Sequence, residues 1–489
     1  MAIGIGSIAA SADFQVGDRI GGRYLIEEIR RGNMGIVYLA SDLDTSQPIA
    51  LKTLETRYLD SQRNRDAFMR EASTWIQLER HPNIVQAYSL QQFGSQPYLL
   101  LERILTRNLR GSTLKDLIFT EPVSIQRMIQ IGIHICDGMI HALSKFPGLV
   151  HRDLKSENIL AGPEGMPKIS DFGMTLEREA DNPVQGSLIH RNGTLDLTDM
   201  ARRMTGTPAF ASPEQCLSWP LDTRSDIYSF GCVLYHMAVK RMPFHRDTIE
   251  KTILAQVYET PAPPHVINEQ IPRDFSALVL NCLEKKPESR FDSFSSLRQE
   301  LFYLHEVLFG EKPVSFRGGL PLTVDEYVAR AQSFVLIQQY TQAQAELRKA
   351  VQAYPRRVDV YYHLGRISFL QKRYERALAE CEKARDALPD DPDLHLLLGK
   401  ICHALSLSDQ AEQAFHKAIR LAPDRAEAYR ESAALCLERQ DYLAAERILR
   451  DALVLCEAKG PLYLQLAELH QRTGKINERY EALENAAQW

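Results

Sequence analysis

The chain of 489 residues is too long for one hydrophobic core, because cores usually stop growing at about 250–300 residues, so we expect two or three domains. Hydrophobic residues make up 44% and charged residues 25%, which is typical of a soluble globular protein and excludes wholesale disorder or a fibrous repeat. The net charge of −5 gives no electrostatic reason to expect nucleic acid as a partner.

Residues 1–20 are predicted to form a flexible tail, because they begin with an apolar stretch but lack the basic segment that opens a secretory signal. No run of about 18 apolar residues follows, so we expect no membrane span. The eight cysteines are scattered without a Cys-x-x-Cys pair, which argues against a zinc site and a disulfide framework. Free thiols in a reducing compartment predict a cytoplasmic protein.

Between residue 21 and about residue 102, short apolar runs alternate with polar residues and are separated by Gly and Asp. The runs Tyr24–Ile29, Ile36–Ala40 and Pro48–Lys52 predict strands of an antiparallel sheet with one solvated face. Apolar residues at helical spacing around Arg65–Leu78 predict one helix within this region.

The pattern is mostly helical from about residue 124 to 308, and a stretch rich in Gly and Pro, 306–323, is predicted to be a linker. Beyond the linker the sequence repeats: Pro355, Pro389 and Pro423 are each separated by 34 residues. Small residues recur in the same phase, which lets two helices approach closely, and the proline ends the second helix. This pattern resembles the tetratricopeptide repeat and predicts an all-α solenoid of about five units over 324–489.

Three segments follow one another in an order that is hard to explain by chance. They are His151-Arg152-Asp153-Leu154-Lys155-Ser156-Glu157-Asn158, then Asp171-Phe172-Gly173, then Gly206-Thr207-Pro208-Ala209-Phe210-Ala211-Ser212-Pro213-Glu214. Upstream lie a glycine-rich turn with Gly32 and Gly35, a strand lysine, Lys52, and a helix glutamate, Glu71. Together these motifs resemble the eukaryotic-type (Hanks-type) Ser/Thr protein kinases found in bacteria.

The resemblance implies a multidomain α+β protein, in which a bilobal kinase fold is followed by the tetratricopeptide solenoid. The kinase domain would span 21–305, with the N-terminal lobe ending at about 102 and the C-terminal lobe at about 305. The family transfers the γ-phosphate of Mg-ATP to Ser or Thr hydroxyls of protein substrates. This chemistry requires the protein mainly to position the reactants and to neutralise phosphate charge.

The resemblance also assigns phosphate and metal contacts. Gly32 and Gly35 would let the backbone fold over the triphosphate, where a Cβ would obstruct. Lys52 would contact the α- and β-phosphates while paired with Glu71. Asn158 and Asp171 would supply oxygen ligands to Mg²⁺, with Mn²⁺ as a substitute.

Catalytic and adenine-binding roles follow from the same motifs. Asp153 would accept or orient the proton of the substrate hydroxyl, and Lys155 would steady the γ-phosphate. Arg152 marks a kinase whose active state is ordered by a phosphate. The adenine site is assigned to apolar side chains and to the backbone of a hinge, namely Ile29, Val37, Ala50, Leu160, Glu102 and Ile104. In addition, Asp226 is expected to anchor the catalytic loop, and Arg290 to pair with Glu214.

Two features depart from the family pattern. Arg30 stands where the first glycine is expected, and two interpretations stay open: altered nucleotide contact, or an arginine on a solvated loop. The segment from Asp171 to Glu214 spans 44 residues, which is longer than the family usually needs. We expect autophosphorylation in this segment at Thr205 and next at Thr198, with phosphate pairing to Arg152. Thr207 is a further candidate, although a structural hydrogen bond near Asp153 is the favoured role for it.

The sequence therefore predicts an active Ser/Thr protein kinase regulated by autophosphorylation. The alternative is an ATP-binding pseudokinase scaffold, which only Arg30 favours. The repeats are expected to bind a peptide or protein ligand, to form a homodimer, or to restrain the kinase domain.

Overall fold

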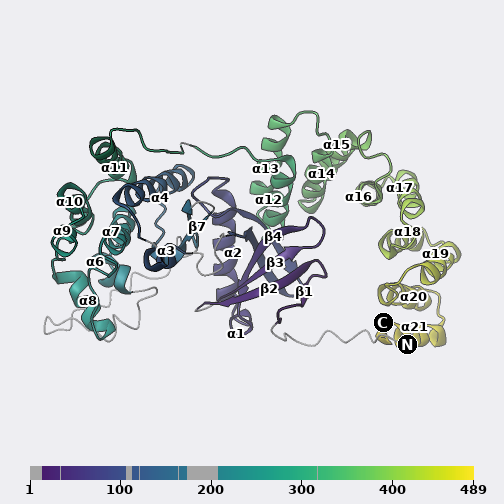
Figure 1. Cartoon of the computed structure of the whole chain (residues 1–489). Coiled ribbons are helices and arrows are strands. Elements are labelled where there is room, and N and C mark those ends of the chain that lie inside the picture. The colour runs from purple at the N-terminus through teal and green to yellow at the C-terminus, as the bar shows by residue number, and fades with distance from the viewer. Residues whose placement is uncertain are drawn as a thin grey trace. The chain divides into compact units, whose positions relative to one another are not determined.

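The computed structural model describes residues 14–32, 35–105, 113–120, 122–162, 165–172, 208–316 and 318–488. The predicted phosphorylation sites Thr198, Thr205 and Thr207 lie outside these described residues, as does Gly173. The chain divides into two compact units, Met1–Leu322 and Thr323–Trp489 (Figure 1).

An antiparallel sheet of six strands opens the first unit, with the order β1-β2-β3-β4-β6-β5. Side chains of β3 alternate between buried and half-buried, as the predicted period of two requires. Three residues of β3 join Tyr24, Leu51 and Leu100 in a core cluster on one face of the sheet: Ile36, Tyr38 and Ala40. The strands are β1 (Arg19–Ile20), β2 (Tyr24–Arg31), β3 (Gly35–Asp42), β4 (Gln47–Leu54), β5 (Ala87–Phe93) and β6 (Gln96–Glu102).

Helix α2 (Gln62–Gln77) interrupts the sheet, as predicted, and begins three residues before the predicted start. The reason is its N-cap: the Ser61 hydroxyl accepts a hydrogen bond from the Asn64 backbone N–H. The short helix α1 (Thr56–Leu59) precedes it. The buried face of α2 carries Phe68, Ala72, Trp75 and Ile76.

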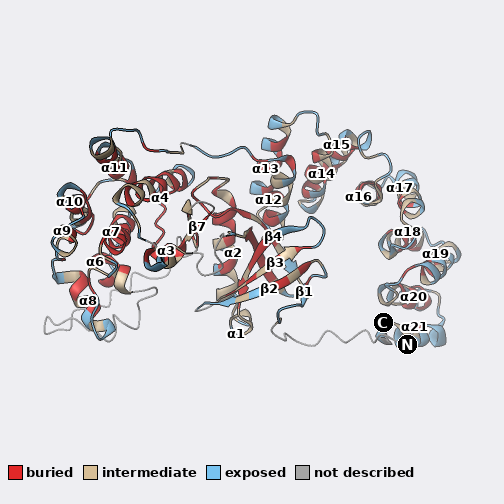
Figure 2. Ribbon diagram, viewed as in Figure 1, coloured by how far each residue is buried: buried red, intermediate tan, exposed pale blue. Residues whose placement is uncertain are grey.

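The rest of the first unit is mostly helical, and its central helices α4 and α7 are buried along most of their length (Figure 2). A two-stranded hairpin, β7 with β8, lies between them in sequence. The elements are α3 (Leu114–Thr120), α4 (Ile125–Lys145), η1 (Ser156–Asn158), β7 (Ile159–Ala161), β8 (Pro167–Ile169), η3 (Pro208–Phe210), α6 (Pro213–Cys216), α7 (Thr223–Val239), α8 (Ile249–Tyr258), α9 (Pro264–Ile267), α10 (Arg273–Cys282), η4 (Pro287–Ser289) and α11 (Phe294–Phe309).

Within the described residues 323–488 the second unit consists of five consecutive helix pairs, which confirms the predicted solenoid. The helices α13 and α17 end two residues before Pro355 and Pro423. The pairs are α12 (Val324–Leu336) with α13 (Tyr340–Ala353), α14 (Val360–Leu370) with α15 (Tyr374–Arg385), α16 (Pro392–Ala404) with α17 (Ser408–Leu421), α18 (Ala426–Glu438) with α19 (Tyr442–Leu455), and α20 (Gly460–Arg472) with α21 (Ile476–Gln488).

The small residues predicted to let helices approach do so at two positions. A Cβ added at Gly365 would lie 2.3 Å from Cys381 Sγ, and one at Gly399 would lie 2.4 Å from the Phe415 ring. All eight cysteines are free thiols, and seven of them are buried. Among the described residues, no helix combines the length and apolar character needed to cross a membrane.

Replacing Gly399 with Ala is expected to destabilise the repeat unit by about 1–3 kcal/mol, because the added methyl overlaps the buried Phe415 ring. Chemical denaturation followed by circular dichroism measures the change. The double variant Gly399→Ala/Phe415→Leu makes room for the methyl and should cost less than the sum of the single variants. Additive costs would show that the two side chains do not clash.

Candidate active site

The cation of Lys52 joins three elements at one point. Its Nζ lies 2.7 Å from Glu71 Oε1 on α2 and 2.7 Å from Asp171 Oδ1, which follows β8. Burial alone would lower the pKa of Lys52, but the Asp171 and Glu71 carboxylates outweigh it and raise that pKa. Burial likewise opposes ionisation of Asp171, and Lys52 nevertheless holds the Asp171 pKa below its ordinary value. Lys52 and Asp171 are therefore both charged at neutral pH.

Three side-chain rings pack against one another next to this ion pair. Trp75 lies one helical turn after Glu71, and its ring centroid is 6.3 Å from that of Phe172. Phe172 is completely buried, and its ring lies 4.9 Å from the ring of His151. The Trp75 indole N–H donates to the Val85 carbonyl at 2.8 Å, which fixes the ring. The three rings thus connect α2 with the motif that begins at His151 and with the motif that contains Phe172.

The catalytic loop is anchored by Asp226 near the start of α7, as predicted. Asp226 Oδ2 accepts from the His151 N–H at 2.7 Å, and Oδ1 accepts from the Arg152 N–H at 2.9 Å. Burial raises the pKa of Asp226 to about 6, so the carboxylate is mostly ionised at neutral pH. Gln215 holds the next peptide group, between Arg152 and Asp153: its Nε2 donates to the Arg152 carbonyl at 2.8 Å.

Asp153, Lys155 and Asn158 form one hydrogen-bonded group at the catalytic loop. Lys155 Nζ lies 2.7 Å from Asp153 Oδ2, and Asn158 Nδ2 donates to the same oxygen at 2.9 Å. Because the nitrogen of Asn158 faces Asp153, its amide oxygen is the atom left to act as a ligand. Asn158 and Asp171 thus offer an amide oxygen and a carboxylate, a set of hard donors that fits Mg²⁺.

The backbone of this site is strained. Arg152 and Asp171 both have positive φ, 66° and 60°, in the left-handed region that residues other than glycine rarely occupy. Each such residue costs on the order of 1–3 kcal/mol and persists only where the surroundings hold it. At Arg152 the surroundings are the hydrogen bonds from Gln215 and to Asp226.

The register of the strands determines on which face of the sheet each predicted nucleotide-binding residue lies. Val37 pairs with Lys52, and Ala50 pairs with Leu101, so Val37 and Lys52 share the face opposite to the Tyr38 core cluster. Ile29 instead pairs with Tyr38 and packs against that cluster. The structure therefore does not bring Ile29 to the face of Val37 and Lys52, because a bulge between Ile26 and Glu28 shifts the register of β2.

The hinge residues Glu102 and Ile104 lie at and just after the end of β6. Glu102 is held by Lys168, whose Nζ lies 3.0 Å from Glu102 Oε2, and Leu160 lies on the neighbouring hairpin strand β7. The predicted glycines Gly32 and Gly35 face each other, since the Gly32 N–H donates to the Gly35 carbonyl at 2.8 Å. This bond joins the residue after β2 to the first residue of β3.

Arg30 is part of strand β2 rather than of a loop, and it pairs with Val37 across the strands. Its Nε lies 2.8 Å from Glu28 Oε1, and about half of each side chain is exposed. The residue at the first glycine position thus continues a regular strand and is partly neutralised by Glu28.

A buried ion pair holds the short helix α6 against the segment that precedes α11. Arg290 pairs with Glu214 as predicted, and the structure shows that the pair is bidentate: Arg290 NH1 and NH2 lie 2.7 and 2.9 Å from the two oxygens of Glu214. Burial would raise the pKa of Glu214, but Arg290 lowers it. Arg290 also donates to three backbone carbonyls, those of Arg224, Glu284 and Lys285.

Gln215 and Trp75 have positions in the site that the sequence analysis did not assign. Ser212 and Gln215 form a reciprocal capping box at the start of α6, and the Ser-x-x-Gln spacing is the sequence signal for it. The spacing does not reveal that the same Gln215 amide reaches the Arg152 carbonyl. Trp75 has the periodicity of a core residue, and only the fold shows it against Phe172.

This architecture and site define a protein kinase. The sequence model of the family described as "Protein kinase domain" matches residues 24–302, more than half of the chain, and the chain belongs to this family. Two models described as "Tetratricopeptide repeat" match residues 328–392 and 392–425. Both resemblances found in the sequence are thereby confirmed.

The curated relatives are bacterial. A probable serine/threonine-protein kinase of Clostridium acetobutylicum is 31% identical over 288 residues, covering 58% of this chain and 40% of the relative. The serine/threonine-protein kinase PknB of Mycobacterium tuberculosis is 32% identical over 297 residues, covering 60% and 44%. The chain thus spans less than half the length of these relatives. The solved PknI kinase domain of Mycobacterium tuberculosis aligns with a TM-score of 0.43 at 17% identity, covering 59% of this chain and 98% of the solved chain.

Replacing Lys52 with Met is expected to reduce ATP-dependent phosphate transfer by ~10²-fold or more, because it removes a fixed cation from the charged site and leaves two carboxylates facing each other. Steady-state kinetics with ATP measure the loss. Lys251→Met, which removes a lysine at an exposed ion pair on α8, is the matched control and should retain activity. Equal rates for both variants would contradict the assigned role of Lys52.

Replacing Arg290 with Met is expected to destabilise the first unit by about 3–5 kcal/mol, because the buried Glu214 carboxylate loses its partner. Urea denaturation followed by tryptophan fluorescence measures the free energy of unfolding. Arg224→Met removes the exposed pair with Asp222 and should cost at most about 1 kcal/mol. Similar costs for the two variants would show that burial does not strengthen the Glu214–Arg290 pair.

Proposed function

We propose that this chain is an active Ser/Thr protein kinase that transfers the γ-phosphate of Mg-ATP to hydroxyl groups of protein substrates. The observation that carries the proposal is the pairing of Lys52 with both Glu71 and Asp171 at 2.7 Å. This arrangement joins α2, β4 and the segment that follows β8. Membership of the protein kinase family and the names of the bacterial relatives support the same function.

Each residue of the site has a chemical task in this proposal. Lys52 binds the α- and β-phosphates of ATP, and Glu71 orients it. Asp153 accepts a hydrogen bond from the substrate hydroxyl and orients the attacking oxygen, while Lys155 stabilises negative charge on the γ-phosphate. Asn158 and Asp171 would hold Mg²⁺, which neutralises phosphate charge when bound. Val37, Ala50 and Leu160 would contact adenine, with backbone hydrogen bonds from Glu102 and Ile104.

The pseudokinase alternative has little support in the described residues. A pseudokinase usually lacks one of the charged catalytic residues, whereas Lys52, Glu71, Asp153, Asn158 and Asp171 are all present. Arg30, the feature that favoured the alternative, continues strand β2 and pairs with Glu28. An arginine placed in this way leaves the lysine and aspartate pairing of the site intact.

Regulation by autophosphorylation is part of the proposal, with Thr205 first, Thr198 next and Thr207 as a further candidate. The supporting observation is the place of Arg152 directly before Asp153, with its backbone held by Asp226 and Gln215, because a guanidinium can pair with a phosphate through two hydrogen bonds. We also propose that the repeats bind a peptide or protein ligand, that the protein works in the cytoplasm, and that nucleic acid is not a partner. A homodimer through the repeats is an alternative use of the same surface.

Incubation of the full-length protein with [γ-³²P]ATP and Mg²⁺ is expected to label the protein on Ser or Thr. Asp153→Asn should abolish the label, since the amide cannot accept the hydroxyl proton, although it preserves the shape of the side chain. Mass spectrometry of the labelled protein should locate phosphate on Thr205 or Thr198. Label that persists in Asp153→Asn, or no label in the wild type with protein substrates added, would refute the kinase activity.

A further inference from the structure

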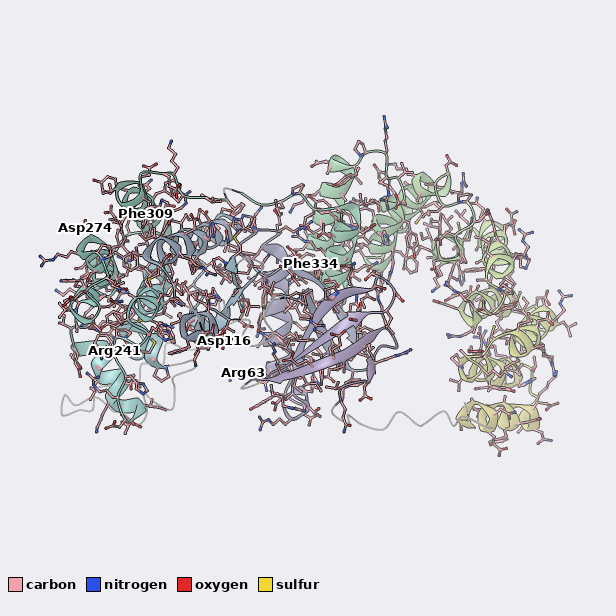
Figure 3. All side chains as sticks on the ribbon, in the orientation of Figure 1. Arg63, Asp116, Arg241, Asp274, Phe309 and Phe334 are labelled. Carbon is pink, nitrogen blue, oxygen red and sulfur yellow. The ribbon has the colours of Figure 1, made fainter. Side chains whose placement is uncertain are left out.

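A segment beyond the matched kinase residues packs along the catalytic unit. The family match ends at residue 302, and α11 ends at Phe309, which is labelled in Figure 3. Residues 311–316 and 318–322, called the strap here, then run past α4 (Figure 1) and precede α12 in the sequence. The whole strap belongs to the first compact unit, which extends to Leu322. Pro313 and Leu322 are buried in it.

The strap begins with contacts to α4. Gln130 on α4 makes two hydrogen bonds with Val314 of the strap: its Nε2 donates to the Val314 carbonyl at 2.5 Å, and its Oε1 accepts from the Val314 N–H at 3.1 Å. The Gln130 amide thus pairs with both backbone groups of Val314, as a residue of a neighbouring β-strand would. It fixes the direction of the strap along the helix.

Asp137, a buried carboxylate in the middle of α4, is the central anchor of the strap. Its Oδ2 accepts from the Ser315 hydroxyl at 2.8 Å and from the Phe316 N–H at 2.9 Å, while its Oδ1 accepts from Arg298 Nε at 2.5 Å. Arg298 also donates to the Ser315 hydroxyl. Asp137 is only 4% exposed, so the strap supplies two of the donors that a buried carboxylate requires.

The strap then contacts the residues that follow α2. The Leu320 N–H donates to the Arg80 carbonyl at 2.8 Å, and Gly319 approaches so closely that a Cβ would lie 2.9 Å from the same oxygen. The Asn83 N–H donates to His81 Nδ1 at 3.1 Å, so this nitrogen is the acceptor of the ring. His81 Nε2 therefore carries the hydrogen and points to the Phe316 carbonyl at 3.4 Å.

The end of α2 is held from the other side by α4. His141 Nε2 lies 2.7 Å from the carbonyl of Leu78, the C-cap residue of α2, and the His141 ring stacks on His81 at 4.8 Å between centroids. Burial is the main cause that lowers the pKa of both histidines, that of His81 to about 4, so both rings are neutral at pH 7. The strap and α4 together enclose the turn at Leu78–His81.

We propose that the strap is a positioning element of the kinase site, which holds the end of α2 against α4 and thereby keeps Glu71 within reach of Lys52. The inference rests on the proposed function, because it concerns the site that binds ATP. Helix α2 carries Glu71, and a helix whose C-terminal turn is released can shift as a rigid rod. The strap also connects the catalytic unit directly to α12, so the boundary of the functional kinase lies at Leu322 rather than at the end of the family match.

The test uses the full chain with the double substitution Ser315→Ala/Phe316→Pro, which removes both strap donors to Asp137. Hydrogen exchange should rise about tenfold at the amides of α2, since buried hydrogen bonds are lost, and stay unchanged at those of α7. The dissociation constant of a fluorescent ATP analogue with Mg²⁺ should also rise about tenfold. Ser315→Thr keeps the hydroxyl and should behave like the wild type. Gln126→Ala removes a contact at the far end of the strap, to Glu311, and should also have no effect.

A second comparison separates positioning of Glu71 from general destabilisation. Glu71→Gln weakens nucleotide binding by itself, and adding the strap substitutions should weaken it no further, because both act through the same side chain. Additive losses, or unchanged hydrogen exchange at α2, would overturn the proposal. If the strap variants behave as expected but the wild type transfers no phosphate, the kinase function fails and the strap proposal stands. If phosphate transfer is normal in the wild type and in the strap variant, the strap proposal fails alone.

Discussion

The catalytic unit depends on one interaction, the placement of the Lys52 cation between two carboxylates from different elements. A lysine that loses its water must be compensated by nearby charge, and Glu71 and Asp171 supply that charge at hydrogen-bonding distance. The pairing forms only if the sheet, α2 and the β8 hairpin meet correctly. The contacts among the Trp75, Phe172 and His151 rings hold these elements together, and so does the enclosed turn at Leu78–His81.

The same principle recurs away from the site. Glu214 with Arg290, and Asp137 with Arg298, are buried pairs that join segments distant in sequence. In each pair the arginine or the carboxylate also bonds backbone or hydroxyl groups, which compensates the loss of hydration. Such pairs tolerate few alternative arrangements, because a shifted partner leaves a buried charge. The segments of the catalytic unit are thus held in place by buried ion pairs as well as by its hydrophobic core.

Much of this organisation could be predicted from residues in order along the chain. The kinase motifs and the 34-residue period depend on spacing, which the sequence displays directly, and the resemblance to the kinases implied the pairing of Lys52 with Glu71. The face to which Ile29 points depends on a bulge in β2, and a shift of one residue reverses every side chain after it. The roles of Gln215, Trp75 and the strap arise from contacts between distant segments. A stretch rich in Gly and Pro predicts a linker, and no pattern within it reveals that Ser315 and Phe316 complete the hydrogen bonds of Asp137.

The two peptide groups that flank Arg152 have a consequence for the proposed kinase reaction. The Arg152 N–H is held by Asp226 and the Arg152 carbonyl by Gln215, so neither peptide plane can rotate freely, and the left-handed φ of 66° is maintained from both sides. The ordering entropy and the strain of this loop are therefore incurred when the chain folds rather than when a substrate binds. In the proposed reaction, a peptide that reaches Asp153 meets a carboxylate whose direction is already fixed. The loss of freedom at that encounter falls mainly on the substrate.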